Sequence, residues 1–158
     1  MKLSTRSRYG LRALVAVARS PESLVTAEIL ADGEEVSKRY LDEILRTLRK
    51  SGFLNSSRGR KGGYTLARSP QEINLLDIVD ALEGSTELVP CVDDPEICDR
   101  SPDCPTRPIW TAATAQLREV FSSMNLAAFL ECPDENCAGP SLLQISLPRM
   151  DPTEPESF

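Results

Sequence analysis

The 158-residue sequence contains no histidine, only one tryptophan, and no apolar run that approaches the length of a membrane span. Without histidine, the chain cannot build a histidine-based catalytic triad, a histidine metal site or a histidine general base. A bilayer-spanning helix needs about 20 apolar residues, so no membrane segment is expected. The first residues lack the apolar centre of a signal peptide, and we therefore expect a cytoplasmic protein.

The sequence also lacks a phosphate-binding glycine motif and a pair of carboxylates in a pocket-like context. These absences argue against an enzyme. Apolar residues make up 41% and charged residues 27% of the chain, which is the composition of a folded protein. The length suits one domain, or one domain with an appended arm.

Charge is distributed unevenly along the chain. Residues 1–70 carry 14 lysines and arginines against 7 aspartates and glutamates, whereas residues 71–158 carry 4 against 17. The net charge of −6 therefore hides a basic half and an acidic half. Because a polyanion responds to the local field and not to the net charge, the basic half is the candidate surface for nucleic acid.

All five cysteines lie in the acidic half, three of them in one irregular loop and two, Cys132 and Cys137, further on. An odd number of cysteines in a cytoplasmic chain favours metal or redox chemistry over a disulfide framework. Cys91, Cys98 and Cys104 of the loop can converge on one centre. Thiolates suit an iron–sulfur cluster or zinc, and the absence of C-x2-C pairs disfavours structural zinc.

The basic half has the pattern of three helices. The first is expected over residues 4–18 with Ser4 or Thr5 as its N-cap, and a second, short helix is expected to start at Thr26. Ser37 is a good N-cap for the third helix. Its apolar positions follow the spacing i, i+3, i+4 and i+7 and share one buried face, formed by Leu41, Ile44, Leu45 and Leu48.

Two short strands, over residues 53–57 and 64–67, flank a basic glycine-rich loop and predict a β-hairpin. Helix, short helix, capped basic helix and hairpin is the order of a winged helix-turn-helix. We therefore predict a mainly α fold with a small β-hairpin wing, in which the third helix enters the major groove of double-stranded DNA. The candidate DNA-binding residues are Lys38, Arg39, Asp42, Glu43, Arg58, Arg60 and Lys61.

These DNA contacts divide into two kinds. Arg39, Asp42 and Glu43 suit base edges, and either acid can accept from a cytosine amino group. The wing residues suit phosphates or a narrow minor groove, with Arg58 as the main candidate for entering that groove. The alternative is a structural or protein-interaction role for the same domain.

The acidic half predicts a helix over residues 75–83, a loop, and a long helix that begins at Pro108 and runs to residue 124. A small head offers little surface to cover the apolar stripe of the long helix, so we predict a homodimer. Two such heads would meet a palindromic operator at points about 34 Å apart. The predicted interface consists of Trp110, Ala113, Leu117, Val120, Phe121 and Met124.

These patterns divide the chain into four parts. Residues 1–83 form the winged helix-turn-helix domain, and residues 84–107 form the cysteine-rich, cluster-binding loop. Residues 108–146 hold the dimerisation helix and the C-terminal region, with a short helical turn expected from Leu126. Residues 147–158 are rich in proline and acidic residues and are expected to be disordered.

Several motifs together resemble those of the Rrf family of bacterial transcriptional regulators, which includes IscR, NsrR and CymR. The resemblance covers roughly residues 1–130. It implies a winged-helix dimer that binds DNA, with an oxygen-, iron- or NO-sensitive iron–sulfur cluster on Cys91, Cys98 and Cys104. Besides the three-cysteine loop followed by Trp110, the motifs are MKLSTRSRYG (1–10), VSKRYLDEIL (36–45), LRKSGFL (48–54) and RGRKGGY (58–64).

The chain departs from this family at the fourth cluster ligand. IscR-like members place a histidine where this chain has Arg107, and NsrR-like members use a partner carboxylate where it has Arg8. Arginine stays protonated and offers no lone pair to iron. The ligand and the cluster type, 2Fe–2S or 4Fe–4S, stay open. The candidates for the ligand are Cys132, Cys137, Asp99, Asp103, a small thiol and solvent.

The sequence thus predicts a homodimeric DNA-binding transcription regulator, such as a repressor, that senses redox, iron or NO status through an iron–sulfur cluster. Two alternatives remain open. One is a cluster-free repressor in which cysteine thiols act as the switch. The other is a protein-interaction regulator of a metabolic enzyme.

Overall fold

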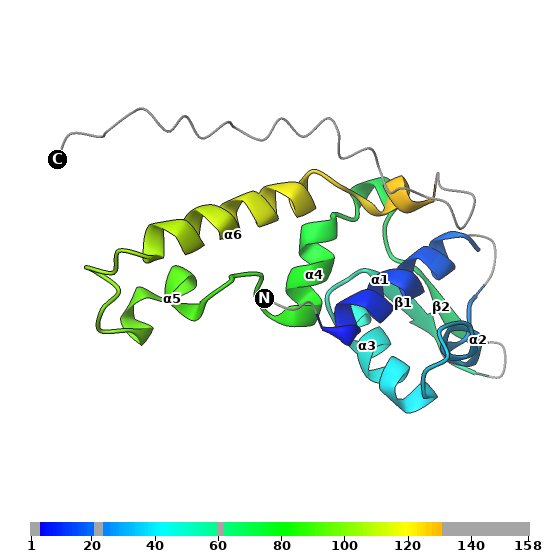
Figure 1. Ribbon diagram of the computed structural model, residues 1–158. Helices are drawn as coiled ribbons and strands as arrows, with labels where there is room; N and C mark the ends of the chain where they lie inside the picture. Colours follow the sequence, from blue (N-terminus) through cyan, green and yellow to red (C-terminus); the bar gives the residue numbers. More distant parts are fainter. Residues whose placement is uncertain (1–3, 21–23, 60–61, 131–158) are drawn as a thin grey trace.

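The computed structural model describes residues 4–20, 24–59 and 62–130. We call the described part of residues 4–83 the head and residues 84–130 the arm. Figure 1 shows α4 between the other helices of the head and the long helix α6 of the arm. The elements are α1 (Thr5–Ala18), α2 (Ala27–Gly33), α3 (Lys38–Lys50), β1 (Leu54–Ser57), β2 (Gly63–Leu66), η1 (Pro70–Glu72), α4 (Leu75–Glu83), α5 (Pro90–Asp93), η2 (Pro95–Ile97), α6 (Arg107–Ser122) and η3 (Leu126–Phe129).

Local capping explains where most helices of the head begin. The hydroxyl of Thr26 accepts from the N–H of Ile29 at 3.3 Å, and that of Ser37 accepts from Tyr40 at the same distance. The predicted cap of α3 is therefore confirmed, and Thr26 caps α2 in the same way. Ser4 is the N-cap residue of α1, as expected, but its side chain caps no amide of that helix and donates to Glu83 of α4 instead.

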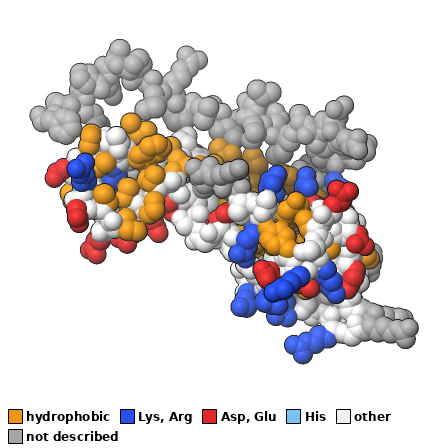
Figure 2. Space-filling model, turned by 60° about the horizontal axis from the view of Figure 1, so that its bottom comes forward, with side chains coloured by type: hydrophobic (Ala, Val, Ile, Leu, Met, Phe, Trp, Pro, Cys, Tyr) orange, Lys and Arg blue, Asp and Glu red, His pale blue; other side chains and the backbone are white. Residues whose placement is uncertain are grey.

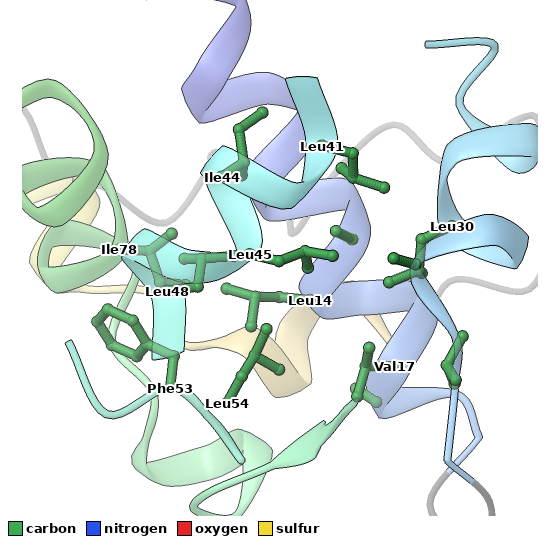
Figure 3. Packing of buried hydrophobic residues seen from close by; sticks show 14 of the residues in the cluster. Leu14, Val17, Leu30, Leu41, Ile44, Leu45, Leu48, Phe53, Leu54 and Ile78 are labelled. Carbon is green, nitrogen blue, oxygen red and sulfur yellow. The ribbon is translucent and has the colours of Figure 1, made fainter. Parts of the chain in front are cut away.

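The core of the head forms where α1, α3 and α4 meet. The four predicted α3 residues are all 0% exposed, and burying each such side chain contributes about 1.5–3 kcal/mol. Figure 3 shows Leu14 of α1, Leu45 and Leu54 pointing into one common centre, with Ile78 of α4 beside them. A close approach of α1 to α4 depends on Gly10, where a Cβ would lie 2.5 Å from a methyl carbon of Leu82.

The wing is an antiparallel pair in which Leu54 of β1 faces Leu66 of β2. The backbone of Val25 extends this pair, donating to Tyr64 at 3.1 Å and accepting from it at 2.9 Å. Gly59 at the wing tip has a φ of +113°, which a residue with a side chain rarely adopts. The predicted fold, mainly helical with a two-stranded hairpin after the third helix, is confirmed.

The arm returns to the head at the end of α6. The N–H of Leu75 donates to the carbonyl oxygen of Met124 at 3.0 Å, and the N–H of Leu126 donates to the carbonyl oxygen of Ile73 at 2.9 Å. The side chain of Asn74 also donates to the Ser122 carbonyl at 2.7 Å. Met124 therefore lies beyond α6, in a backbone pairing with the start of α4.

Two details of the arm differ from the expectation. The loop predicted to be irregular contains the helical turns α5 and η2, each starting at a proline and too short for a periodic pattern. The long helix starts one residue earlier and ends two residues earlier than expected. No helix in the described ranges is long and apolar enough to cross a membrane.

Candidate DNA-binding surface and cysteine segment

The outward face of α3 carries the predicted base-contacting residues together. They line one surface hollow of about 430 Å³, formed by Lys38, Arg39, Asp42, Glu43 and Arg46. This arrangement follows from the buried stripe of α3, because the residues between the stripe positions must point to solvent. The structure thus gathers the four predicted residues of α3 on one face and adds Arg46 to them.

The cationic side chains of this face differ in whether they have a hydrogen-bond or ion-pair partner. Lys38 hydrogen-bonds the carboxylate of Glu28 on α2, and this bond raises the pKa of Lys38 and lowers that of Glu28. Arg39 and Arg46 have no ion-pair or hydrogen-bond partner within the described residues. The two arginines are therefore available to an incoming polyanion, whereas Lys38 also orients α3 against α2.

A second hollow connects α3 to the wing. It measures about 190 Å³ and is lined by Asp42, Arg46, Arg49 and Tyr64. Arg49 donates to the hydroxyl of Ser56 on β1 at 3.2 Å. Arg46 and Arg49 are not among the DNA-binding residues predicted from the sequence. Their spacing from Arg39 and Asp42, close to whole turns of a helix, is the signal that places them on the same face.

The wing extends the basic surface. Arg58 is exposed beside Gly59 at its tip, whereas Arg60 and Lys61 lie outside the described residues. Figure 2 shows most of the visible lysine and arginine side chains on the lobe of the head, together with some acidic ones, while the lobe of the arm displays mainly apolar and acidic side chains. The charge asymmetry of the sequence is therefore also an asymmetry in space.

Contacts with α1 fix the orientation of α3. The hydroxyl groups of Thr5 and Tyr40 lie 2.7 Å apart, and the rings of Tyr9 and Tyr40 meet edge to face with centroids 6.1 Å apart. Arg6 donates to the Thr47 hydroxyl at 3.3 Å. These contacts fix the outward face of α3 relative to the rest of the head.

The three loop cysteines lie on different pieces of residues 84–107 of the arm, which we call the cysteine segment. Cys91 is in α5, Cys98 is exposed after η2, and Cys104 precedes α6; all three are free thiols. In the described part of the chain, no three Cys, Asp or Glu side chains lie close enough to hold a metal ion. The donor chemistry suits a soft metal centre, but the three thiols must move together to share one. Cys132 and Cys137 lie outside the described residues.

The environment of Cys104 favours its thiolate. The Thr106 hydroxyl, 3.3 Å from the sulfur, lowers the pKa of Cys104, and the backbone amides of Thr106 and Arg107 at the start of α6 lower it further. A lowered pKa makes a thiol a better metal ligand and a more reactive nucleophile at neutral pH.

Arg107 connects two of the cysteine positions. Its side-chain Nε donates to the carbonyl oxygen of Cys91 at 3.1 Å, and its backbone N–H donates to the carbonyl oxygen of Cys104 at 3.2 Å. The residue that stands at the histidine position of IscR-like members therefore ties the two segments together. In both hydrogen bonds Arg107 is the donor, so the arginine itself needs no lone pair.

The apolar stripe of α6 is covered only in part by the described residues of one chain. Trp110 is 41% exposed, and Ile109 beside it is 63% exposed. The other predicted interface residues are half-buried, and only Thr114 of this helix is buried. Among the described residues, this apolar face is thus only partly covered. That face consists of Trp110, Ala113, Leu117, Val120 and Phe121, with Met124 just beyond the helix.

Known proteins share both the sequence and the fold. Residues 3–131 match the Rrf2 family, described as iron-dependent transcriptional regulators. The chain is 36% identical over 142 residues to Protein rrf2 of Nitratidesulfovibrio vulgaris, covering 87% of this chain and 95% of that protein. The structure of CymR, the global cysteine regulator of B. subtilis, matches with a TM-score of 0.69 and 29% identity over 85% of this chain and 99% of that one.

A second solved structure, T. potens IscR, matches with a TM-score of 0.68 and 30% identity over 90% of this chain and 96% of that one. The family match extends over the head, the cysteine segment and α6 together. A winged head with a free basic face is the part that such regulators need for reading DNA. The chain therefore belongs to the Rrf2 family of DNA-binding transcriptional regulators and is not an enzyme.

Proposed function

We propose that this regulator binds a palindromic operator as a homodimer, with α3 in the major groove and the wing tip over the minor groove. The observation that carries this proposal is the outward face of α3, where Arg39 and Arg46 lack a partner among the described residues and stand beside Asp42 and Glu43. Arginine suits guanine and a carboxylate suits the cytosine amino group, so this face can read a G·C-containing half-site.

The same proposal assigns dimerisation to residues 108–146, and chiefly to α6. Exposed apolar residues at Ile109 and Trp110 continue into the half-buried stripe at Leu117 and Phe121. Pairing this stripe with that of a second copy removes apolar surface from water and joins two heads for two half-sites. Residues 1–83 then serve as the DNA-binding domain and residues 84–107 as the sensing segment.

For the sensing step, we propose an iron–sulfur cluster on Cys91, Cys98 and Cys104. Three thiols on one short segment, the lowered pKa of Cys104 and the iron-dependent description of the family support this assignment. When bound, the cluster would supply a redox- and NO-sensitive group beside α6. Arg107 would keep the Cys91 and Cys104 segments adjacent while the cluster forms.

The cofactor is tested by purifying the full chain without oxygen. We expect brown protein with visible absorbance and with iron and sulfide in comparable amounts per chain. Cys132→Ser and Cys137→Ser, made separately, ask whether either thiol is the fourth ligand. Colourless protein with stoichiometric zinc would contradict the cluster assignment.

A cluster-free thiol switch is the second candidate, and one observation favours it. The three thiols are free and apart in the described chain, and Cys104 is activated by Thr106 at the start of α6. In this alternative, a two-electron oxidant such as hydrogen peroxide joins two thiols in a disulfide. Mass mapping of iron-free protein after oxidation distinguishes the two: disulfide formation that alters DNA binding supports the switch, and unchanged DNA binding contradicts it.

A further inference from the structure

A half-buried polar junction lies where α4, residues 86–88 and α6 meet. Arg118 of α6 faces the Asp80 carboxylate of α4, with Nη1 3.3 Å from Oδ1 and Nη2 3.2 Å from Oδ2. The same Nη1 donates to the Thr86 hydroxyl, which itself donates to Asp80 Oδ1 at 2.9 Å. Thr86 is 0% exposed, so its hydroxyl depends on these partners.

Glu87 and Thr114 complete this group, which we call the Arg118 junction. Arg118 Nη1 lies 3.6 Å from Glu87 Oε1, and the glutamate side chain is only 15% exposed. The N–H of Leu88 donates to the hydroxyl of Thr114, a buried residue of α6, at 3.2 Å. Residues 86–88 are thus held by α4 on one side and by α6 on the other.

The junction lies between the cysteine segment and the recognition helix. Cys91 follows Leu88 closely in the chain, and α5, which contains Cys91, packs against α6. On the other side, Asp80 belongs to α4, which packs against both α1 and α3. Figure 1 shows this position of α4 between α6 of the arm and the other helices of the head. A displacement of the cysteine segment therefore reaches α4 first at Thr86 and Asp80.

We propose that the Arg118 junction transmits the state of the cysteine segment to α3, with Arg118 as the positioning residue. This inference rests on the proposed sensing function. A ligand that draws Cys91 toward the other two thiols pulls on residues 86–88. Because one guanidinium binds Asp80 and Glu87 together, that pull also moves α4. Without the guanidinium, the two carboxylates lose their shared counter-charge, and the Thr86 hydrogen bond to Asp80 is the one side-chain contact described above that still joins residues 86–88 to α4, so the pull on α4 weakens.

The test compares DNA binding in two states of the full chain. DNA duplexes that bind are selected from a random-sequence pool, once with iron-loaded protein and once with iron-free protein. The Kd of a selected duplex is then measured for both states of the protein, and the larger Kd divided by the smaller measures the coupling. In the native chain we expect a ratio on the order of 10 or more. In Arg118→Met, which removes the charge and every donor, we expect a ratio within about twofold of one. The iron and sulfide content per chain of Arg118→Met should stay at the native level.

A matched control and a second variant keep the test decisive. Arg12→Met removes an ion pair to Glu34 elsewhere in the head and should leave the ratio native. Arg118→Lys keeps the charge but not the paired donors, so its ratio should fall between the other two. If Arg118→Met does not fold, the Kd ratio of Arg118→Lys serves as the test, and a native ratio in that variant overturns the inference.

Hydrogen exchange supplies a readout that a purely structural role would not give. In the native chain, amide protection in α4 should differ between iron-loaded and iron-free protein, and this difference should vanish in Arg118→Met. A native Kd ratio in Arg118→Met overturns the inference and leaves the sensing function standing. A ratio of one in the native chain overturns the sensing function itself.

Discussion

At the scale of single residues, Glu83 shows how a side chain at the end of one helix determines the start of another. Its Oε1 accepts from the backbone N–H of Ser4 at 2.9 Å and from the Ser4 hydroxyl at 2.8 Å, and the Ser7 hydroxyl donates to the same oxygen. Glu83 therefore places a negative charge at the N-terminus of α1, where the helix dipole favours it. The contact joins the two helices that enclose the core with α3.

This contact predicts a pH dependence. Burial raises the pKa of Glu83, but hydrogen bonds from Ser7 and Ser4 outweigh it, so the pKa lies below its usual 4.5. A lowered folded-state pKa means that the stabilisation is complete above pH 4.5 and is lost as pH falls through the folded value. Glu83→Gln should cost about 1–2 kcal/mol of unfolding free energy at pH 7, and the difference from the native chain should shrink in acid.

Urea denaturation at several pH values measures this difference. The control is Glu119→Gln, an exposed residue of α6, whose difference from the native chain should be small at every pH. A cost of Glu83→Gln that stayed constant down to pH 3 would show that the charge of Glu83 contributes nothing.

Arg58 allows a residue-scale test of the wing. Arg58→Ala should weaken operator binding and reduce the slope of log K against log salt by about one, because one phosphate contact is lost. Arg100→Ala on the exposed surface of the arm is the matched control and should change neither quantity. Fluorescence anisotropy titrations over a range of salt concentrations measure both. An unchanged slope in Arg58→Ala would remove Arg58 from the DNA-binding surface.

At the scale of elements, a feature could be predicted from the sequence where its contacts join residues close together in the chain, and not where they join distant ones. The buried stripe of α3 and the cap at Ser37 depend on residues within two helical turns, so the sequence pattern is sufficient to predict them. The pairing of Val25 with Tyr64 and the binding of Glu83 at Ser4 join residues far apart in the chain. No periodicity signals such contacts, because they exist only after the helices have packed.

The candidate site divides in the same way. The outward face of α3 follows from its buried face, so Lys38, Arg39, Asp42 and Glu43 were predictable as a group. The spacing of the cysteines indicated one segment, but not that α5 and η2 would hold the thiols apart.

The stripe of α3 gives a prediction for this element. Leu45 is 0% exposed at the centre of the core in Figure 3, so Leu45→Ala should leave a cavity and lower the unfolding free energy by about 2–5 kcal/mol. Lys50→Ala at the exposed end of the same helix is the control and should change stability by no more than about 0.5 kcal/mol. Urea denaturation gives both values, and equal costs would contradict the assignment of Leu45 to the core.

At the scale of the whole molecule, the head and the arm differ in what they leave uncovered. The head presents cations around α3 and at the wing tip, and the arm presents the partly exposed apolar stripe of α6. A basic face favours DNA, whereas an apolar stripe favours a like surface. In the dimer that we propose, each chain would supply one DNA-binding head, and the α6 stripes of the two chains would join them.

The proposed dimer makes a prediction at this scale. Leu117 is half-buried on the apolar face of α6, and Ala115 is exposed on another face of the same helix. Leu117→Glu places two like charges in the interface of a dimer, so sedimentation equilibrium should show monomers where the native chain forms dimers. Ala115→Glu adds the same charge outside the interface and should sediment as the native chain does.

Operator binding should separate Leu117→Glu from Ala115→Glu in the same way, because each Leu117→Glu monomer binds only one half-site. Its affinity for a palindromic duplex should approach its affinity for a duplex with one half-site, whereas the native chain and Ala115→Glu should prefer the palindrome strongly. If Leu117→Glu remained a dimer with native preference for the palindrome, then a surface other than the α6 stripe would join the two heads.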